Sequence, residues 1–323
     1  MRNIYIDSCV KEGGIYHYIL NEKGEAVFIE KTPISEPMYS IIRDNKFYTL
    51  LKSPFEDNEN SALAAHEMDG DKIGKKLYEI STLGKEACHL EKAGESIFAV
   101  NYTSGSIFKT PDILKIHKNR EIKGEKVNLQ RQEMPHTHCV ILTPDKKYIA
   151  ATDLGLDKIF IYDLSLDFNL ISETKVEDGM GPRHIIFEGD ILYCLCELGH
   201  KLISFNYDNG KLKYISEVYT LPEDFYGYDI AAAVRINGDK IYVSNRGSNT
   251  IAVFKKDNGY FESIGFIDVC GNWPRDFDII DNILICCNEI SGTVTFFKLN
   301  ENGLAEKPYQ ILNIPAALCV VIN

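Results

Sequence analysis

The chain has 323 residues, a formal net charge of −12 and no block of lysines or arginines, so nucleic acid is a disfavoured partner. Its nine cysteines, an odd number without CxxC pairs, predict buried reduced thiols in a cytoplasmic protein rather than a disulfide framework. No apolar run approaches a membrane span and the first residues lack a signal-peptide core, so we expect neither. A small anionic substrate fits this composition, because a local arginine cluster can outweigh a dilute negative field.

Short β-rich runs alternate with Gly, Asn and Asp turns along the chain, and amphipathic helical periodicity is almost absent. The runs form a repeated unit, in which a first strand, a tight polar turn and a second strand are followed by a polar loop and a third strand. The first strands of six copies lie at 37–42, 88–90, 138–142, 183–187, 231–236 and 275–279. The second strands end 43 to 52 residues apart, at Leu51, Asn101, Asp153, Cys196, Asn245 and Asn288. This period is typical of four-stranded propeller blades.

A seventh unit is divided between the two ends of the chain. Residues 315–322 have the pattern of a first strand, whereas residues 4–7 and 14–18 have that of second and third strands. Pairing these segments closes a ring and removes two exposed sheet edges. The sequence therefore predicts an all-β fold, a seven-bladed β-propeller of four-stranded antiparallel blades, whose single domain spans residues 1–323.

Polar residues recur where first strands begin and second strands end. These two positions lie at the same edge of an antiparallel blade, and the first strand of a blade is nearest the propeller axis. We therefore expect them to surround one mouth of the central channel. The residues concerned are His136, His138, Asp153, Arg183, His184, Glu197, Arg246, Arg275 and Glu289. Arginine suits bidentate binding of carboxylates and phosphates, and a desolvated glutamate is a candidate general base.

Strand alternation predicts which of these side chains share a face. His136 and His138 are two residues apart, so both should point to the same side, whereas His184 should alternate away from Arg183 and fill a position between blades. A metal ion would need further ligands, for which Asp153 or Glu197 are candidates, but no second His or Cys cluster completes a tetrahedral set. We therefore predict a site without metal or cofactor.

Short motifs accompany these residues in chain order. They are NYTSG at 101–105, PHTH at 135–138, DLGLDK at 153–158, GPRH at 181–184, EL at 197–198, SNRG at 244–247 and WPRDF at 273–277. Together they resemble the propeller-type 6-phosphogluconolactonase family, which also includes the fungal carboxy-cis,cis-muconate cyclases. The resemblance implies a seven-bladed propeller with a metal-independent site of His, Arg, Glu and Arg. Residue by residue, that site carries over to His136 or His138, Arg183, Glu197 and Arg246.

The leading hypothesis is hydrolysis of a sugar-derived lactone, with 6-phosphogluconolactone converted to 6-phosphogluconate as the simplest case. Arg183 and Arg246 would bind the anionic group or the oxyanion, and Glu197 or His138 would take a proton from the attacking water. A second hypothesis is the lactonising or isomerising reaction on an unsaturated dicarboxylate. A third is a non-catalytic propeller that binds a protein partner, which would predict apolar and aromatic groups at the channel mouth rather than Arg, His and Glu. The additional substrate-binding candidates are Arg275 and Asp153.

Overall fold

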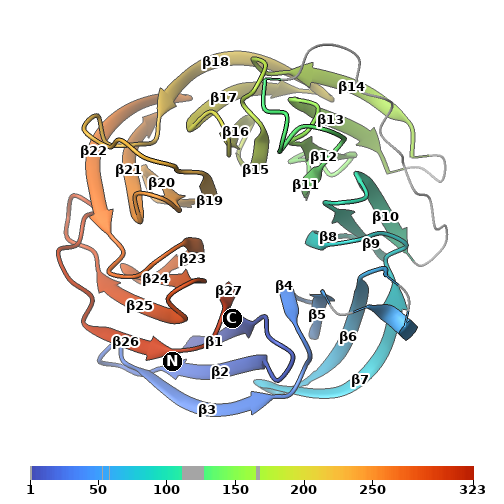
Figure 1. The fold of residues 1–323 in the computed structure, drawn as a ribbon, viewed down its shortest axis with the longest axis vertical. Helices are drawn as coiled ribbons and strands as arrows, with labels where there is room; N and C mark the ends of the chain where they lie inside the picture. Colours follow the sequence, from blue (N-terminus) through green and yellow to red (C-terminus); the bar gives the residue numbers. More distant parts are fainter. Residues whose placement is uncertain (1, 53, 58, 111–126, 165–167) are drawn as a thin grey trace.

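The structure is a computed structural model that describes residues 2–52, 54–57, 59–110, 127–164 and 168–323. Seven antiparallel sheets stand around a central axis as the blades of a propeller (Figure 1). The innermost strands are largely buried, and the outermost strands are largely exposed. The predicted seven-bladed β-propeller is confirmed. Within the described part of the chain, no helix has the length and apolar character needed to cross a membrane.

The strands of each blade are given from the axis outward. The first blade contains β27 (Ala317–Ile322), β1 (Arg2–Ser8), β2 (Gly14–Leu20) and β3 (Ala26–Thr32). The second contains β4 (Pro37–Arg43), β5 (Lys46–Leu51), β6 (Ala62–Asp69) and β7 (Lys72–Ser81), with a 3-10 helix at Phe55–Asp57 between β5 and β6. The third contains β8 (Ala87–Ala93), β9 (Ser96–Asn101) and β10 (Ser106–Thr110).

The remaining four blades follow the same plan. The fourth contains β11 (Thr137–Leu142), β12 (Tyr148–Asp153), β13 (Lys158–Asp163) and β14 (Leu170–Lys175). The fifth contains β15 (Pro182–Glu188), β16 (Ile191–Cys196), β17 (Lys201–Asp208) and β18 (Lys211–Tyr219). The sixth contains β19 (Ala231–Asn237), β20 (Lys240–Asn245), β21 (Thr250–Asp257) and β22 (Tyr260–Asp268). The seventh contains β23 (Pro274–Ile280), β24 (Ile283–Asn288), β25 (Thr293–Lys298) and β26 (Gln310–Asn313).

Two blades bear on the sequence predictions. The third has three described strands, and its predicted fourth strand would follow β10, where residues 111–126 lie outside the described part. In the first blade, β27 from the C-terminus pairs with β1 from the N-terminus. The backbone N–H groups of Asn3 and Asn323 donate to each other's carbonyl oxygens, both at 2.9 Å. The predicted closure of the ring by strands from both ends is therefore confirmed.

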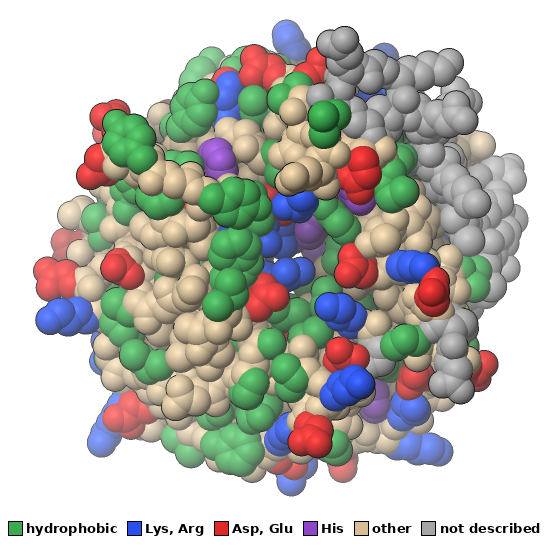
Figure 2. All heavy atoms as spheres, viewed as in Figure 1, with side chains coloured by type: hydrophobic (Ala, Val, Ile, Leu, Met, Phe, Trp, Pro, Cys, Tyr) green, Lys and Arg blue, Asp and Glu red, His purple; other side chains and the backbone are tan. Residues whose placement is uncertain are grey.

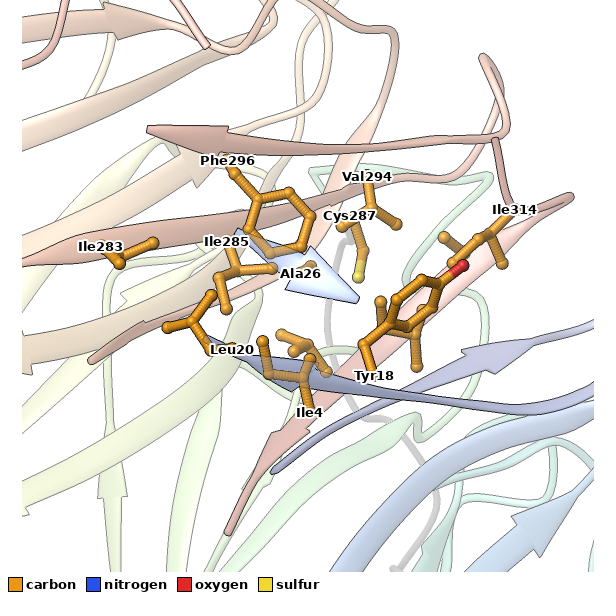
Figure 3. Packing of buried hydrophobic residues seen from close by; sticks show 13 residues of the cluster. Ile4, Tyr18, Leu20, Ala26, Ile283, Ile285, Cys287, Val294, Phe296 and Ile314 are labelled. Atoms are coloured by element: carbon orange, nitrogen blue, oxygen red, sulfur yellow. The ribbon is translucent and has the colours of Figure 1, made fainter. Parts of the chain in front are cut away.

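The hydrophobic core lies mainly between neighbouring blades. Figure 3 shows the cluster that joins the first and seventh blades, in which Ile4 and Tyr18 pack against Ile285 and Phe296. Comparable clusters fill the other spaces between blades, including that of Tyr5 and Phe47 between the first and second blades. Each blade is a thin meander that cannot bury both of its faces alone, so its stability depends on the neighbours that stack against it.

An irregularity near the start of each innermost strand decides which side chains reach the channel. In all seven blades the register of the first two strands shifts there, through a β-bulge. A bulge breaks the alternation of side chains and re-aims the inserted residue. The residues inserted at these bulges are Met38, Cys88, His138, Arg183, Ala232 with Ala233, Arg275 and Leu318.

Candidate active site

One mouth of the central channel contains a cavity of about 260 Å³. Figure 2 looks onto this mouth and shows basic side chains gathered in the hollow at the centre of the ring. The inserted residues of five bulges line the cavity, namely Met38, Cys88, His138, Arg275 and Leu318. The other lining residues are Cys9, Lys52, Glu86, Tyr102, Arg131, Glu197, Arg246, Glu289 and Ala316. The mouth is therefore rich in basic groups, although the whole chain is acidic.

Glu197 is a buried carboxylate that lines this cavity, and it directly follows β16. Its Oε2 atom lies 2.7 Å from Nη2 of Arg246 and 2.9 Å from Nε of Arg183. Its Oε1 atom forms a further ion pair with Nη2 of Arg131. Burial raises the pKa of Glu197, but the positive charges of Arg246, Arg183 and Arg131 outweigh burial and lower the pKa well below its usual range. Glu197 is therefore ionised and holds three guanidinium groups together.

The backbone fixes two of these arginines. Nη2 of Arg246 donates to the carbonyl oxygen of Ala231 at 2.9 Å, and Nη1 of Arg183 donates to the carbonyl oxygen of Ala232. Burial, followed by the positive charge of Arg246, lowers the pKa of Arg183 to about 9. Arg183 therefore remains protonated at neutral pH. The N–H group at its Nε is not aligned for a hydrogen bond, so its contact with Glu197 is an ion pair only.

The two histidines of the PHTH motif have different surroundings. His138 lines the cavity, and its Nδ1 atom lies 3.8 Å from Sγ of Cys88. Burial and the charge of Arg183 lower the pKa of His138 well below its usual value, so the ring is neutral. The ring of His136 instead stacks on Tyr102 with centroids 4.4 Å apart, and its Nε2 lies 3.0 Å from Oε1 of Glu133. The ring of His138 also contacts Tyr102, edge-to-face with centroids 5.4 Å apart, but of the two histidines His138 is the one that lines the cavity.

Of the two predicted substrate-binding residues, one reaches the cavity. Arg275 lines it, and Nη1 of this arginine lies 3.1 Å from Oε2 of Glu289. Asp153 does not line the cavity. Its Oδ1 atom accepts hydrogen bonds from the backbone N–H groups of His136 at 2.9 Å and Leu156 at 3.0 Å. Asp153 thus orders the loop after β12, and its predicted contact with substrate has no support from this arrangement.

The expectation that His184 fills a position between blades is wrong. Its Nε2 atom lies 2.9 Å from Nη1 of Arg183, and its ring packs edge-to-face on His138 with centroids 5.5 Å apart. The ring of His89 lies against it in the same manner, and both histidines line a cavity at the opposite mouth of the channel. The bulge at Arg183 shifts the alternation on which the expectation depended.

Arg131 and Tyr102, which lie next to Glu197 and its arginines, have no counterpart among the predicted site residues. Arg131 lies between β10 and β11, outside the strand edges that the repeat identifies, and it pairs with Glu197. Tyr102 follows β9, and its hydroxyl oxygen lies 3.1 Å from Nη2 of Arg131. Neither the repeat nor strand alternation could have indicated Arg131, because it lies in the segment 127–136 before β11, which contains no strand. In the described ranges, no group of three or more His, Cys, Asp or Glu side chains is arranged to hold a metal ion.

Similarity to known proteins supports the fold and identifies the family. Residues 3–322 match the family described as "Lactonase, 7-bladed beta-propeller". A Staphylococcus aureus protein without an assigned activity is 31% identical, over 93% of this chain and 94% of that protein. The 6-phosphogluconolactonase of Bacillus subtilis is 29% identical, over 98% of this chain and 97% of that enzyme. A crystal structure of a candidate 6-phosphogluconolactonase from Bacteroides fragilis is 26% identical and superposes with a TM-score of 0.87, over 100% of this chain and 98% of that one. The chain therefore belongs to the family of seven-bladed β-propeller lactonases.

Proposed function

We propose that this protein hydrolyses a sugar-derived lactone in the cavity at the channel mouth, with 6-phosphogluconolactone as the leading candidate substrate. The observation that carries the proposal is the cluster of Arg131, Arg183 and Arg246 around Glu197, next to the neutral ring of His138. The family supports lactone hydrolysis, and the name of the Bacillus subtilis relative supports the phosphorylated substrate. The reaction forms an oxyanion and then a carboxylate, and both are anions that fixed guanidinium groups stabilise.

His138 is the side chain that we assign to activation of the water. A general base must accept a proton, and the imidazole of His138 is neutral because burial and Arg183 disfavour its charged form. Glu197 is less suited to this role, because both of its carboxylate oxygens are already engaged by the guanidinium groups of Arg131, Arg183 and Arg246. Glu197 instead keeps Arg183 and Arg246 in fixed positions, which avoids a reorganisation of charge during the reaction.

The reaction then proceeds by attack of water on the lactone carbonyl. His138 takes one proton from the water as the new C–O bond forms, and the carbonyl oxygen becomes an oxyanion. Arg246, which lines the cavity, stabilises this oxyanion together with the longer-range charge of the buried Arg183. Collapse of this tetrahedral intermediate breaks the bond to the ring oxygen, which receives the proton from His138. The product is the open acid, which releases the remaining proton of the attacking water to solvent, and its carboxylate stays near the same arginines until it leaves.

The substrate's phosphate group requires a separate cation. Arg275 and Lys52 both line the cavity, and they extend the positive charge beyond the cluster around Glu197. The side chain of Arg275 is 23% exposed, and its ion pair with Glu289 is made through Nη1. We therefore assign Arg275 to the phosphate, which agrees with the preference of guanidinium groups for bidentate contacts.

The decisive experiment measures acid release from freshly prepared 6-phosphogluconolactone and from unphosphorylated glucono-δ-lactone, above the spontaneous rates. We expect catalysis with the phosphorylated lactone, and Arg275→Ala should raise its KM more than that of the unphosphorylated one. Equal rates with the wild type and with buffer alone would contradict the lactonase proposal for these substrates. The predicted metal independence is tested in the same assay, in which prior dialysis against EDTA should leave the rate unchanged.

A further inference from the structure

Two aromatic side chains lie next to the cationic cavity and take no part in the reaction described above. Tyr228 precedes β19 and Trp273 precedes β23, and their rings stack with centroids 6.4 Å apart and planes inclined by 16°. Figure 2 shows hydrophobic side chains beside the central hollow, on the side of β19 and β23. Tyr228 is 68% exposed, and neither residue belongs to the described clusters between blades. We refer to Tyr228 and Trp273 as the aromatic shelf.

The aromatic shelf is continuous with the arginine cluster. The guanidinium carbon of Arg246 lies 5.5 Å from the ring centroid of Trp273, within the range of a cation–π contact. The carbonyl oxygen of Trp273 accepts a hydrogen bond of 3.0 Å from the backbone N–H of Glu289, the partner of Arg275. A ligand held by these arginines would therefore meet the shelf as soon as it extended beyond the cavity.

The backbone holds both shelf residues in place. Trp273 has a φ of 70°, a left-handed conformation that is costly for a bulky residue, and Oδ1 of Asn249 accepts its N–H at 2.8 Å. Gly247 packs so closely on Tyr228 that a Cβ atom there would lie 1.9 Å from the carbonyl oxygen of Tyr228. Such strain persists only where the surroundings over-determine it, and it concentrates at ligand sites. The ring positions are thus fixed relative to Arg246, the residue before Gly247.

From this arrangement we propose that the aromatic shelf binds a second sugar ring of the substrate, linked to the unit that the arginines hold. The inference rests on the proposed function and deepens it, because it makes glycosylated sugar lactones a substrate class. A cavity of about 260 Å³ is small for a ligand site, since typical pockets measure roughly 300–1,000 Å³, so it has room for one sugar unit. A further ring must then lie outside, where its apolar C–H face can pack on the exposed aromatic surface.

The binding of product acids tests the inference directly. Trp273 is the only tryptophan of the sequence, so intrinsic fluorescence reports on the shelf itself. Wild-type protein is titrated with D-gluconate, with maltobionate, which is gluconate carrying a linked glucose ring, and with 3-phenylpropionate. We expect maltobionate to bind about tenfold more tightly than gluconate and to shift the emission. The ratio should fall to about one in Tyr228→Ala and persist in Tyr260→Ala, a matched change of a tyrosine that is 63% exposed on the outer strand β22.

Every other outcome overturns the inference. Equal affinity for gluconate and maltobionate, absence of binding by both acids, or an unchanged ratio in Tyr228→Ala would each show that the shelf holds no second sugar ring. Tighter binding of 3-phenylpropionate than of maltobionate would assign the shelf to aromatic rings instead. Because binding of the acids requires no turnover, the result is independent of the hydrolysis assay. A protein that prefers maltobionate but hydrolyses no lactone refutes the proposed function alone.

Discussion

His136 and His138 offer a matched pair of substitutions at the scale of single residues. The neutral ring of His138 lines the cavity, whereas the ring of His136 is occupied by Tyr102 and Glu133. We predict that His138→Gln lowers kcat by about 10²–10⁴, the usual contribution of a general base, and that His136→Gln lowers it by less than tenfold. Lactone hydrolysis at saturating substrate measures both, with circular dichroism as a check of folding. Equal losses in the two variants would argue against His138 as the base.

Glu197→Gln isolates the role of the carboxylate as a counterion. Without its charge, Arg131, Arg183 and Arg246 repel one another in a largely buried site, so we expect the free energy of unfolding to fall by about 3–5 kcal/mol. The folded-state pKa of Glu197 lies below its ordinary value, so this stabilisation is present above pH 4.5 and disappears as the pH falls through the folded-state value. The difference between wild type and variant should therefore narrow in acid, as measured by urea unfolding.

Sulfate provides the control for this prediction. An anion that occupies the cavity replaces the lost charge, so added sulfate should raise the melting temperature of Glu197→Gln more than that of the wild type. Equal shifts in the two proteins would mean that sulfate does not take the place of the Glu197 charge, and no shift in either would mean that the arginine cluster does not bind this anion. The same result would weaken the assignment of Arg183 and Arg246 to the oxyanion, because both functions rely on the same guanidinium groups.

At the scale of elements, the contacts between blades supply most of the buried hydrophobic surface. Phe296 of β25 is fully buried between the seventh and first blades, whereas Ile311 of the neighbouring outer strand β26 is 51% exposed. We predict that Phe296→Ala lowers the free energy of unfolding by about 3–5 kcal/mol. The control Ile311→Ala should change it by less than about 0.5 kcal/mol. Similar effects of both in urea unfolding would show that the outer strands contribute as much as the space between blades.

In the innermost strands, β-bulges make the direction of some side chains unpredictable from the sequence pattern. Alternation correctly assigns buried and exposed positions along regular strands, but it fails where a bulge inserts one extra residue. The expected position of His184 between blades is wrong for this reason, because the bulge at Arg183 precedes it. No residue type specifies these bulges, since the inserted residues include Met38, Cys88 and Arg275. Comparing the seven blades position by position is the one route by which sequence could have indicated them.

At the scale of the whole molecule, a buried acid lies where the ring closes. Asp7 of β1 accepts hydrogen bonds from Oγ of Ser40 in the next blade, at 2.8 and 3.0 Å. Burial and the nearby carboxylate of Asp276 raise the pKa of Asp7 to about 8, against the effect of Ser40. The folded state therefore favours the protonated form, and the cost of ionisation grows as the pH rises from about 4 to 8. The thiols of Cys287 and Cys319 also face this carboxyl group and are uncharged at these pH values.

Asp7→Asn should remove that cost. We predict that the variant gains stability relative to the wild type between pH 5 and pH 8, by a few kcal/mol at most, since each pKa unit corresponds to about 1.4 kcal/mol. Urea unfolding of both proteins at the two pH values measures the gain. A constant difference across this range would mean that Asp7 does not titrate within it.

The whole molecule is predicted to be a single domain, in which all seven blades unfold together. Every blade contacts two neighbours and strands from both ends of the chain complete the first blade, so no blade can leave without exposing two apolar faces. We predict one cooperative unfolding transition. Circular dichroism, which reports on all strands, should coincide with the fluorescence of Trp273 in urea. Two separated transitions would contradict the single domain.

The sequence by itself determined the blade repeat, the closure of the ring and the strand edges that carry Arg183, Glu197 and Arg246. Strand period, turn residues and unit length are local properties, so one chain contains enough information for them. Tertiary structure alone decided which histidine faces the cavity, because a bulge is a property of two paired strands. It also decided the position of Arg131, which pairs with Glu197 from the segment before β11. The ionised state of Glu197 likewise depends on the fold, because three guanidinium groups that are far apart in sequence lower its pKa.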